Sequence, residues 1–485
     1  MVVVWPVLLF SMKRVFRNLF AIVAVVQTSL CASAGESNSP AALRPPWLDR
    51  HLSLTDCLNL ALSNNGDVLK SRKDLEAAHG LSVQTRAVVI PKVQLNAEYG
   101  IVGRDAVDRL EVPALPMLPE GLSIDPGDQR WAADIRLVQT ISEGGRLRSA
   151  VRTSKLLRER AVAQHNVLLA NVITDVRTAF YDVLLAEQEI IVSTAAIALL
   201  EKELEDSRRR FEAGTVPRFN VLRAEVELAN ARPQLSRARN NHRIAKNVLV
   251  NLLGYNVPHD LFEDLPLHLA GTLEVDKLDV SLPEALKQAL ELRPELEAAR
   301  KAELLRREGL VQARAGAYPR LDGYVGYGAR KSMFAAELDR EVHGWEAGVQ
   351  VTWNIFDGAL TRGKVAEANA LLEQAQLDQQ DLARKIELEV RSACSTLTEA
   401  WEVLQSQQKV IEQAEESLRL ARARAEAGTG TQLDVLSAQT ALTQARTTTI
   451  RAKRDYAVAC ARLERAIGAA NPDRITGKGA ENETK

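Results

Sequence analysis

The residue types that carry most enzyme chemistry are scattered through this sequence. Its 7 histidines lack the spacing of a helical zinc motif, and no glycine-rich phosphate-binding loop opens a helix. Cys57, Cys394 and Cys460 lie far apart, so they form neither a metal-type pair nor a disulfide framework. We therefore predict that the chain has no catalytic residues, no metal site and no cofactor, and that it is not an enzyme.

Neither the glycines nor the charges of the chain indicate a nucleotide or a nucleic acid as ligand. The glycine cluster Gly323, Gly326 and Gly328 lies in a segment of alternating polarity, which indicates a strand with small side chains facing a lumen or at a bend. Lys plus Arg number 62 and Asp plus Glu number 63, a formal net charge of -1. That balance provides no electrostatic attraction for nucleic acid, so we predict no such partner.

Residues 1–34 have the features of a cleaved secretory signal peptide. Three basic residues precede the apolar stretch Leu19–Val26, and small residues lead to a cleavage site after Ala34; the basic residues are Lys13, Arg14 and Arg17. Met12 is an alternative start, and acylation at Cys31 is an alternative to cleavage after Ala34. Beyond the leader we find no run of about 18 apolar residues, so we expect no membrane-spanning helix. A mature chain that crosses a membrane must then do so with strands.

The chain contains two copies of one unit. Ser53-Leu54-Thr55-Asp56 returns as Ser281-Leu282-Pro283-Glu284, and Glu212-Ala213-Gly214-Thr215 returns as Glu426-Ala427-Gly428-Thr429. The spacing falls from 228 to 214 residues between these matches, which places an insertion between Tyr99 and Trp131. We assign repeat 1 to residues 53–254 and repeat 2 to residues 281–468. The remaining segments are the leader at 1–34, an N-terminal linker at 35–52, a linker at 255–280 and a disordered tail at 469–485.

Each copy is predicted to contain a very long helix, at residues 146–211 and 364–427, because neither range contains Gly or Pro. Such helices are about 100 Å long. Apolar residues recur on one face at helical spacing, so each long helix needs partner helices. Shorter helices are expected at 53–87, 217–253, 281–315 and 431–467, and two of them placed end to end match one long helix. Pro233 is expected to bend or break its helix.

Between the first short helix and the long helix, each copy has two segments of alternating polarity, at 92–102 and 131–141, then at 320–329 and 345–356. Strands of this length span an outer membrane when they are tilted. A soluble sheet with one solvated face shows the same alternation, but no other helical segment is placed to cover four strands. Four strands cannot close a barrel, so several chains must contribute. The candidate lipid-facing residues are Val93, Leu95, Tyr99, Ile135, Leu137, Val325, Tyr327, Val351 and Trp353.

The duplicated motifs resemble those of the TolC-like outer-membrane factor family over roughly residues 50–470. They are Phe211-Glu212-Ala213-Gly214-Thr215 with Asn220-Val221-Leu222, Glu426-Ala427-Gly428-Thr429 with Asp434-Val435-Leu436, and Trp353-Asn354-Ile355-Phe356-Asp357-Gly358. The resemblance implies a fold that is mainly α with a small β part. Duplicated helical hairpins form a trimeric α-barrel across the periplasm, and four strands per chain contribute to a twelve-stranded outer-membrane β-barrel embedded in lipid.

The same resemblance implies partners and a function. The homotrimer is the passive outer-membrane channel of a tripartite efflux or type I secretion system, joined by a periplasmic adaptor (membrane fusion) protein to an inner-membrane pump of the RND or ABC type. The helical tips, with Gly214, Thr215, Gly428 and Thr429, are the candidate docking sites for the adaptor. The alternative is that the chain is itself a periplasmic coiled-coil adaptor or structural protein. The cargo is left open between drugs, metal ions and secreted proteins.

Asp434 is the candidate pore constriction. It matches the first of the acidic positions that ring the closed periplasmic end in the family, where three carboxylates repel one another and favour cations. The sequence departs from the family pattern at Ser437, the next acidic position, and at Asn220 in the first copy. Asp434 at the start of a helix is equally explained as a helix cap.

Overall fold

The computed structural model describes residues 47, 50–103, 110–112, 122–124, 127–255, 265–274, 276–332 and 337–470. The predicted signal peptide at 1–34, most of the N-terminal linker and residues 471–485 of the predicted tail lie outside the described residues. The described helices and strands all belong to one unit, residues 49–485. Both copies of the repeat therefore lie within the same unit.

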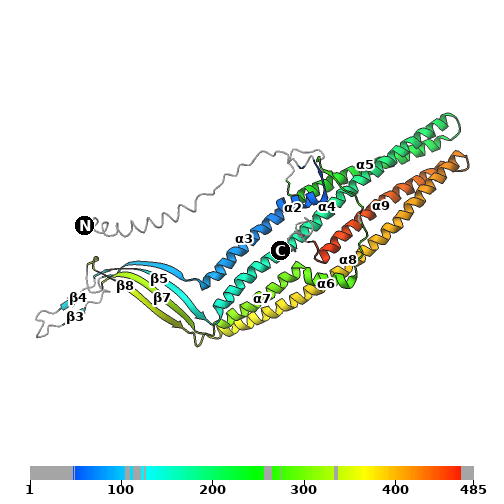
Figure 1. Cartoon of the computed structure of the whole chain (residues 1–485). Helices are drawn as coiled ribbons and strands as arrows, with labels where there is room; N and C mark the ends of the chain where they lie inside the picture. The colour runs from blue at the N-terminus through cyan, green and yellow to red at the C-terminus, as the bar shows by residue number, and fades with distance from the viewer. Residues whose placement is uncertain are drawn as a thin grey trace, which may run out of the picture. The chain divides into compact units, whose positions relative to one another are not determined.

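Two helices of 67 residues each organise the unit, α4 at Arg146–Glu212 and α8 at Leu360–Glu426. Along its length α4 packs first against α3 (Gly66–Arg86) and then against α5 (Arg218–Leu252). In the same way α8 packs against α7 (Pro294–Ala315) and α9 (Gln432–Ala466) (Figure 1). Contacts of α4 with α7 and α9 join the two copies. Each long helix is therefore paired with two shorter ones, one after the other.

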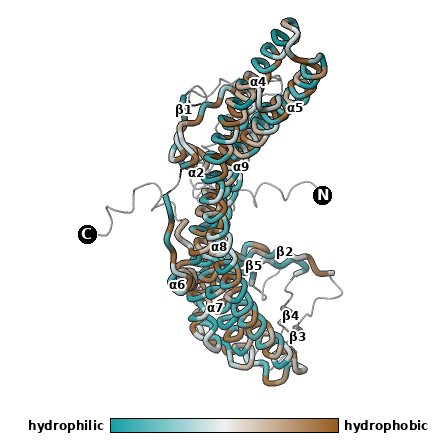
Figure 2. The backbone as a smooth tube through the Cα atoms, turned by 90° about the vertical axis from the view of Figure 1, so that its right-hand side faces the viewer, coloured by the Kyte–Doolittle hydropathy of each residue, from teal (hydrophilic) through white to brown (hydrophobic). Residues whose placement is uncertain are grey.

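Polar and apolar residues alternate along these helices instead of forming long blocks (Figure 2). The apolar positions gather into cores between neighbouring helices: Leu397, Tyr456 and Leu463 pack between α8 and α9. Because each long helix buries only part of its circumference in one chain, large apolar side chains remain exposed; Leu388, for example, is 68% exposed. The helices thus retain surface that one chain does not cover.

The entering helix of each copy is split, where a single helix was expected. Repeat 1 has α2 (Leu54–Asn64) before α3, and repeat 2 has α6 (Leu282–Leu292) before α7. The separating residues Asn65 and Arg293 have ψ of 131° and 121°, which is extended backbone. Pro294 disfavours helical backbone at Arg293, and the Asn65 side chain caps α3 by accepting from the amides of Asp67 and Val68.

Two other expectations about helices need correction. Of the two effects expected of Pro233, a break is contradicted, because the helix α5 continues through this exposed proline; a bend stays a prediction. Among the described residues one helix, α4, contains a stretch long and apolar enough to cross a membrane, with mean hydropathy 1.8. The expectation that no such helix exists was therefore wrong. It required an unbroken apolar run, whereas a stretch can have a high mean hydropathy and still contain one or two charged residues. One such helix is weak evidence for a span, and α4 packs against α3, α5, α7 and α9.

The strands between the entering and long helices form one antiparallel sheet in the order β2–β5–β7–β8. Its strands are Lys92–Ile101, Gln129–Glu143, Arg320–Lys331 and Glu341–Thr352. Trp353, which was expected within the last strand, lies just beyond it. Two short pairs were not expected: β1 (His51–Leu52) lies parallel to β6 (His268–Leu269), and β3 (Leu110–Val112) lies antiparallel to β4 (Leu122–Ile124). The short 3-10 helix η1 (Ala87–Val89) precedes β2.

Candidate functional site

The register of the sheet places the candidate lipid-facing residues other than Trp353 on one side. Val93 pairs with Leu137, which pairs with Val325; Leu95 pairs with Ile135, which pairs with Tyr327. Directly paired residues share a face, and so do residues two apart on one strand. We call this side the apolar face; its members are Val93, Leu95, Tyr99, Ile135, Leu137, Val325, Tyr327, Val351 and two residues that were not singled out, Trp345 and Val349.

The apolar face is open to the surroundings in the single chain. Its side chains are between 40% exposed at Leu137 and 79% exposed at Trp345. So large a contiguous apolar surface marks contact with a membrane or with another protein. The alternation along residues 345–356 already places Trp345 on the same strand face as Val351, and its pairing with Tyr327 confirms that it belongs to the apolar face.

Trp353 is placed differently from the other candidates. It follows β8, and its indole Nε1 donates to the carbonyl of Ala317 at 3.2 Å. The next apolar residues, Ile355 and Phe356, are 82% and 88% exposed. An aromatic residue with a polar tip at this position, between the apolar face and the long helix, matches the residues that lie at lipid interfaces.

The opposite side of the sheet, the polar face, has its own network of hydrogen bonds and ion pairs. Asn96 Nδ2 donates to Asp134 Oδ2 at 3.1 Å, and Arg136 forms an ion pair with Glu346 two strands away. The side chains remain partly or largely exposed. One side of the sheet is therefore suited to water and the other to lipid, as in strands of a membrane barrel.

The two edges of the sheet are unpaired. Within the described part of the chain no strand pairs with the outer side of β2 or of β8. An edge exposes a row of backbone amides and carbonyls, and in a membrane each unpaired group costs several kcal/mol. A sheet with this apolar face therefore needs neighbouring chains to complete it.

The helical tips far along α4 and α8 end in the same turn. The amide of Thr215 donates to the carbonyl of Arg210 at 2.9 Å, and the amide of Thr429 donates to that of Arg424 at 2.9 Å. Gly214 and Gly428 have φ of 74° and 73°, and no atom lies within 4 Å of a Cβ built on either. Their backbone conformation, not lack of space, requires glycine.

Asp434 is a helix-capping residue in the single chain. Its carboxylate accepts from the amide of Thr431 at 2.9 Å and from the hydroxyl of Thr431 at 2.7 Å, while its own amide donates to the Thr431 hydroxyl at 3.2 Å. The Thr431 hydrogen bonds hold the pKa of Asp434 below its ordinary value, so the carboxylate stays ionised. The capping alternative thus describes the contacts of Asp434 in one chain, and the pore role stays a proposal.

The three cysteines of the described residues, Cys57, Cys394 and Cys460, are buried or half-buried. Burial raises the pKa of Cys57 to about 12 and also raises the pKa of Cys394 and Cys460. Each thiol therefore remains protonated and behaves as a small apolar group. Within the described residues no group of three His, Cys, Asp or Glu side chains is placed to hold a metal ion.

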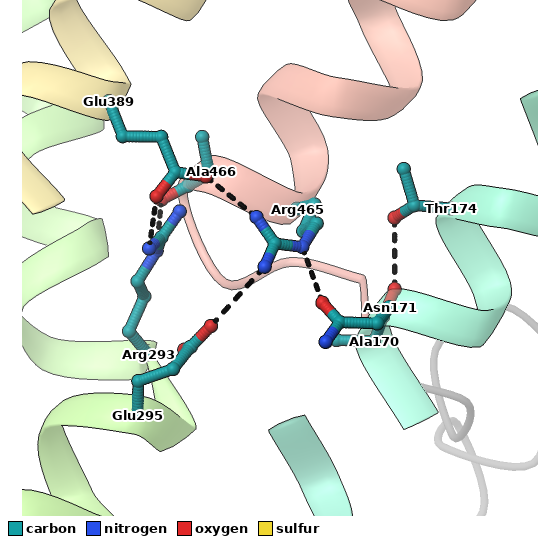
Figure 3. Close-up of polar contacts among 8 residues, drawn as sticks. All are labelled: Ala170, Asn171, Thr174, Arg293, Glu295, Glu389, Arg465 and Ala466. Carbon is teal, nitrogen blue, oxygen red and sulfur yellow. Dashed lines mark hydrogen bonds and ion pairs between the residues drawn. The ribbon is translucent and has the colours of Figure 1, made fainter. Parts of the chain in front are cut away.

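An ion-pair network at the junction of the two copies was not predicted (Figure 3). The guanidinium of Arg293 donates to Glu389 and to the carbonyl of Ala466, both at 2.7 Å. Arg465 donates to the other oxygen of Glu389 at 2.7 Å and to Asn171 on α4, also at 2.7 Å. Burial alone would raise the pKa of Glu389, but the two arginines hold it below its ordinary value. The network ties α6, α7, α8, α9 and α4 together.

Comparisons with known proteins agree on one family and fold. The family model described as "Outer membrane efflux protein" matches residues 57–255 and 285–469. The chain is 25% identical to the alkaline protease secretion protein AprF of Pseudomonas aeruginosa, over 85% of this chain and 83% of AprF. It is 26% identical to the cobalt-zinc-cadmium resistance protein CzcC of Cupriavidus metallidurans, over 90% of this chain and 94% of CzcC. The solved CmeC outer membrane channel of Campylobacter jejuni superposes with a TM-score of 0.72 at 18% identity, over 89% of each chain.

Proposed function

The chain belongs to the outer membrane efflux protein family, and on this premise we propose that three copies form a passive duct from the periplasm to the exterior. It is an outer-membrane channel of the efflux and secretion class, and the family consists of channels, not enzymes. The observation that carries the proposal is the four-stranded sheet with an exposed apolar face, a polar face and two unpaired edges.

The number of copies follows from closing the sheet. About eight strands is the practical minimum for a barrel, so the four strands of one chain cannot close. In the proposed trimer, β8 of each chain pairs with β2 of the next, giving twelve strands and leaving no edge in lipid. The apolar face then contacts lipid and the polar face lines the lumen. The exposed apolar residues of the long helices supply surface for packing between the three chains.

The helical tips are proposed to meet a periplasmic adaptor protein, which couples the duct to an inner-membrane pump of the RND or ABC type. The first tip presents Phe211 and Phe219, 43% and 66% exposed, beside Gly214 and Thr215. Exposed aromatic residues near a rigid turn are common at protein interfaces. The two relatives are named for protease secretion and for metal resistance, so at similar identity the family serves different cargoes. We propose that the pump selects the cargo here as well.

Asp434 is proposed to line the periplasmic mouth. Three copies of one carboxylate around the axis repel when ionised and attract cations. Capping and pore lining are compatible, because two of the carboxylate's acceptor positions serve Thr431 and the side chain is otherwise exposed.

Two substitutions of neighbouring residues test the lipid-facing assignment. Leu95→Lys places a charge on the apolar face, whereas Asn96→Lys places the same charge on the polar face beside Asp134. A lysine facing mid-membrane lipid costs about 2 to 4 kcal/mol. We expect Leu95→Lys to lower the amount of folded protein in outer membranes and Asn96→Lys to leave it unchanged. Equal effects of the two would contradict the assignment.

Deletion of residues 92–141 tests the sheet as a whole. The remaining chain keeps both long helices but loses β2 and most of β5, so we expect helical protein that no longer inserts into outer membranes. Retained insertion would argue against the barrel.

The tip glycines have a matched pair of variants. Gly214→Val forces a β-branched residue into left-handed backbone, while Gly214→Asn places there a residue that tolerates it. We expect loss of transport with Val and retained transport with Asn, in cells that contain the cognate pump. Transport that survives Gly214→Val and Gly428→Val would remove the reason for assigning the tips to the adaptor.

A further inference from the structure

Large side chains on the polar face lie directly opposite glycines. The sheet register pairs Arg130 with Gly100, Asp134 with Gly328, Arg136 with Gly326, and Tyr324 with Gly348. These four pairs cover all three strand interfaces of the sheet. The two pairs between β5 and β7 join residues from distant parts of the chain, so the local alternation does not explain them.

In two of these pairs the large side chain occupies the space that a Cβ on the glycine would take. A Cβ built on Gly348 lies 2.6 Å from the hydroxyl oxygen of Tyr324, and one on Gly100 lies 3.2 Å from Nε of Arg130. A Cβ on Gly328 lies 3.1 Å from the Cβ of Asp134. The side chains of Tyr324 and Arg130 therefore lie along the sheet, over their paired glycines, instead of standing up from it.

Arg136 shows the consequence most clearly. It extends across Gly326 on β7 to form its ion pair with Glu346 on β8, and its guanidinium carbon lies 5.3 Å from the centre of the Tyr324 ring. A Cβ on Gly326 would lie 3.2 Å from the carbonyl oxygen of Ile135 and 3.6 Å from Cγ of both Arg136 and Glu346, so a larger side chain there would stand between the two partners. Strands are about 4.8 Å apart, so this ion pair spans almost 10 Å of sheet while remaining close to it.

We propose that these pairs set the bore of the channel: glycines on the lumen side let the long polar side chains lie flat, which keeps the lumen wide enough for bulky solutes. The proposal rests on the barrel proposed above. It deepens that function by assigning the width of the lumen in the strand segment to named residues. In the proposed trimer each of these side chains occurs three times around the axis, so together they affect the open radius of the lumen on all sides.

A thiol on the polar face can report the bore from outside. Gln350 is exposed on β8, between the Gly348 level and the long helices, so an external reagent must pass Gly326 and Gly348 to reach it. In the Gln350→Cys protein we would measure labelling by maleimide-polyethylene glycols of increasing mass, added outside, and subtract the labelling of the parent. Adding Gly326→Val or Gly348→Val should abolish labelling by the largest polymers that enter the parent, because Arg136 or Tyr324 must stand up into the lumen.

Two controls separate bore from stability. Gly323→Val lies on the apolar face, where its Cβ meets only the end of the Ile141 side chain and the carbonyl of Gln139, and should leave the size limit unchanged. Combining Gly348→Val with Tyr324→Ala should restore the limit, which a merely structural role for Gly348 does not predict. A size limit that stays the same in both Gly326→Val and Gly348→Val would overturn the proposal.

A second reporter distinguishes failure of this inference from failure of the barrel. The thiol of Val349→Cys is on the apolar face and should be protected from a membrane-impermeant maleimide by lipid. If it is labelled, the barrel itself is wrong and the inference falls with it. If it is protected while the size limit does not move, the barrel stands and the glycine pairs do not set its bore.

Discussion

The two copies of the repeat use the same backbone at three corresponding places but different side chains. At the split in the entering helix, repeat 1 has Asn65 and repeat 2 has Arg293. Asn65 donates to the carbonyl of Leu252 at 2.8 Å, and Arg293 donates to that of Ala466 at 2.7 Å, so each satisfies the end of its returning helix. The two repeats therefore make the corresponding contact with different side-chain chemistry.

The other two places show the same separation of backbone from side chain. At the junction of strand and long helix, Gly145 and Ala359 both have positive φ, 88° and 71°. At the tips, Thr431 and Asp434 form a capping box in repeat 2, whereas in repeat 1 the N-cap residue of α5 is Pro217, which gives no side-chain cap. The hairpin geometry therefore depends on features that both copies keep, and the differences are where the copies can be given separate roles.

The largest difference in stability is expected at the split. Arg293→Asn gives repeat 2 the residue type of repeat 1. It removes a guanidinium that is bonded to a carboxylate and a carbonyl, on a side chain that is only 3% exposed. We expect a loss of about 2 to 4 kcal/mol, because a buried acceptor loses its donor and Glu389 keeps only Arg465. Asn65→Ala should cost about 1 to 2 kcal/mol. Thermal unfolding followed by circular dichroism in detergent measures both.

The same variants have a pH signature. The arginines lower the pKa of Glu389, so its contribution is complete above the ordinary glutamate pKa of about 4.3 and is lost as pH falls through the lower folded value. The parent should therefore approach the stability of Arg293→Asn in acid. Arg391→Asn, which changes an exposed arginine on the same helix as Glu389, is the control and should match the parent. A constant difference between parent and Arg293→Asn at all pH values would contradict this interpretation.

A smaller difference is expected at the junction. Ala359→Gly relieves a left-handed residue of its Cβ and should stabilise the protein by about 0.5 to 1 kcal/mol, after allowance for the greater freedom of glycine in the unfolded chain. Gly145→Ala should destabilise the protein by a similar amount, because alanine disfavours left-handed backbone. No clash adds to this cost, since a Cβ there meets only Cγ1 of Val311 at 3.9 Å. The two midpoints of unfolding should move in opposite directions. A shift of the same sign in both would contradict the expected effect of backbone conformation.

The smallest effect on stability is expected at the tips. There the two repeats differ in charge, with Asp434 in repeat 2 and Asn220 in repeat 1, and this difference is expected to affect ion selectivity. Asp434→Asn keeps much of the cap but removes the charge, and Asn220→Asp adds the charge that repeat 1 lacks. Reversal potentials across planar bilayers should show weaker cation preference in the first and stronger preference in the second. Because its pKa is lowered, Asp434 in the parent should keep its preference until the pH falls below the ordinary aspartate value. Unchanged potentials in both variants would assign Asp434 to capping alone.

Much of the fold could be predicted because its signals are local. Long ranges without Gly or Pro indicate α4 and α8, and period-two alternation indicates the strands and their apolar face. The splits at Asn65 and Arg293 were missed, although Asn-Gly and Arg-Pro are local signals for the end of a helix.

The ion-pair network and the glycine pairs could not have been predicted. Arg293 and Glu389 lie 96 residues apart, and Arg136 and Glu346 lie 210 residues apart. Such contacts depend on the packing of helices and on the register of the sheet, which local patterns in a single sequence do not specify. The pore role proposed for Asp434 depends on neighbours in other chains, whereas its capping contacts lie within one chain.

Cryo-electron microscopy of the protein extracted in detergent tests the central claim most directly. We predict a particle with threefold symmetry and a twelve-stranded barrel, in which β8 of each chain lies beside β2 of the next, the apolar face of Leu95, Ile135 and Tyr327 points outward, and the polar face of Asn96, Asp134 and Arg136 points inward. A monomer whose apolar face packs onto its own helices would contradict the account.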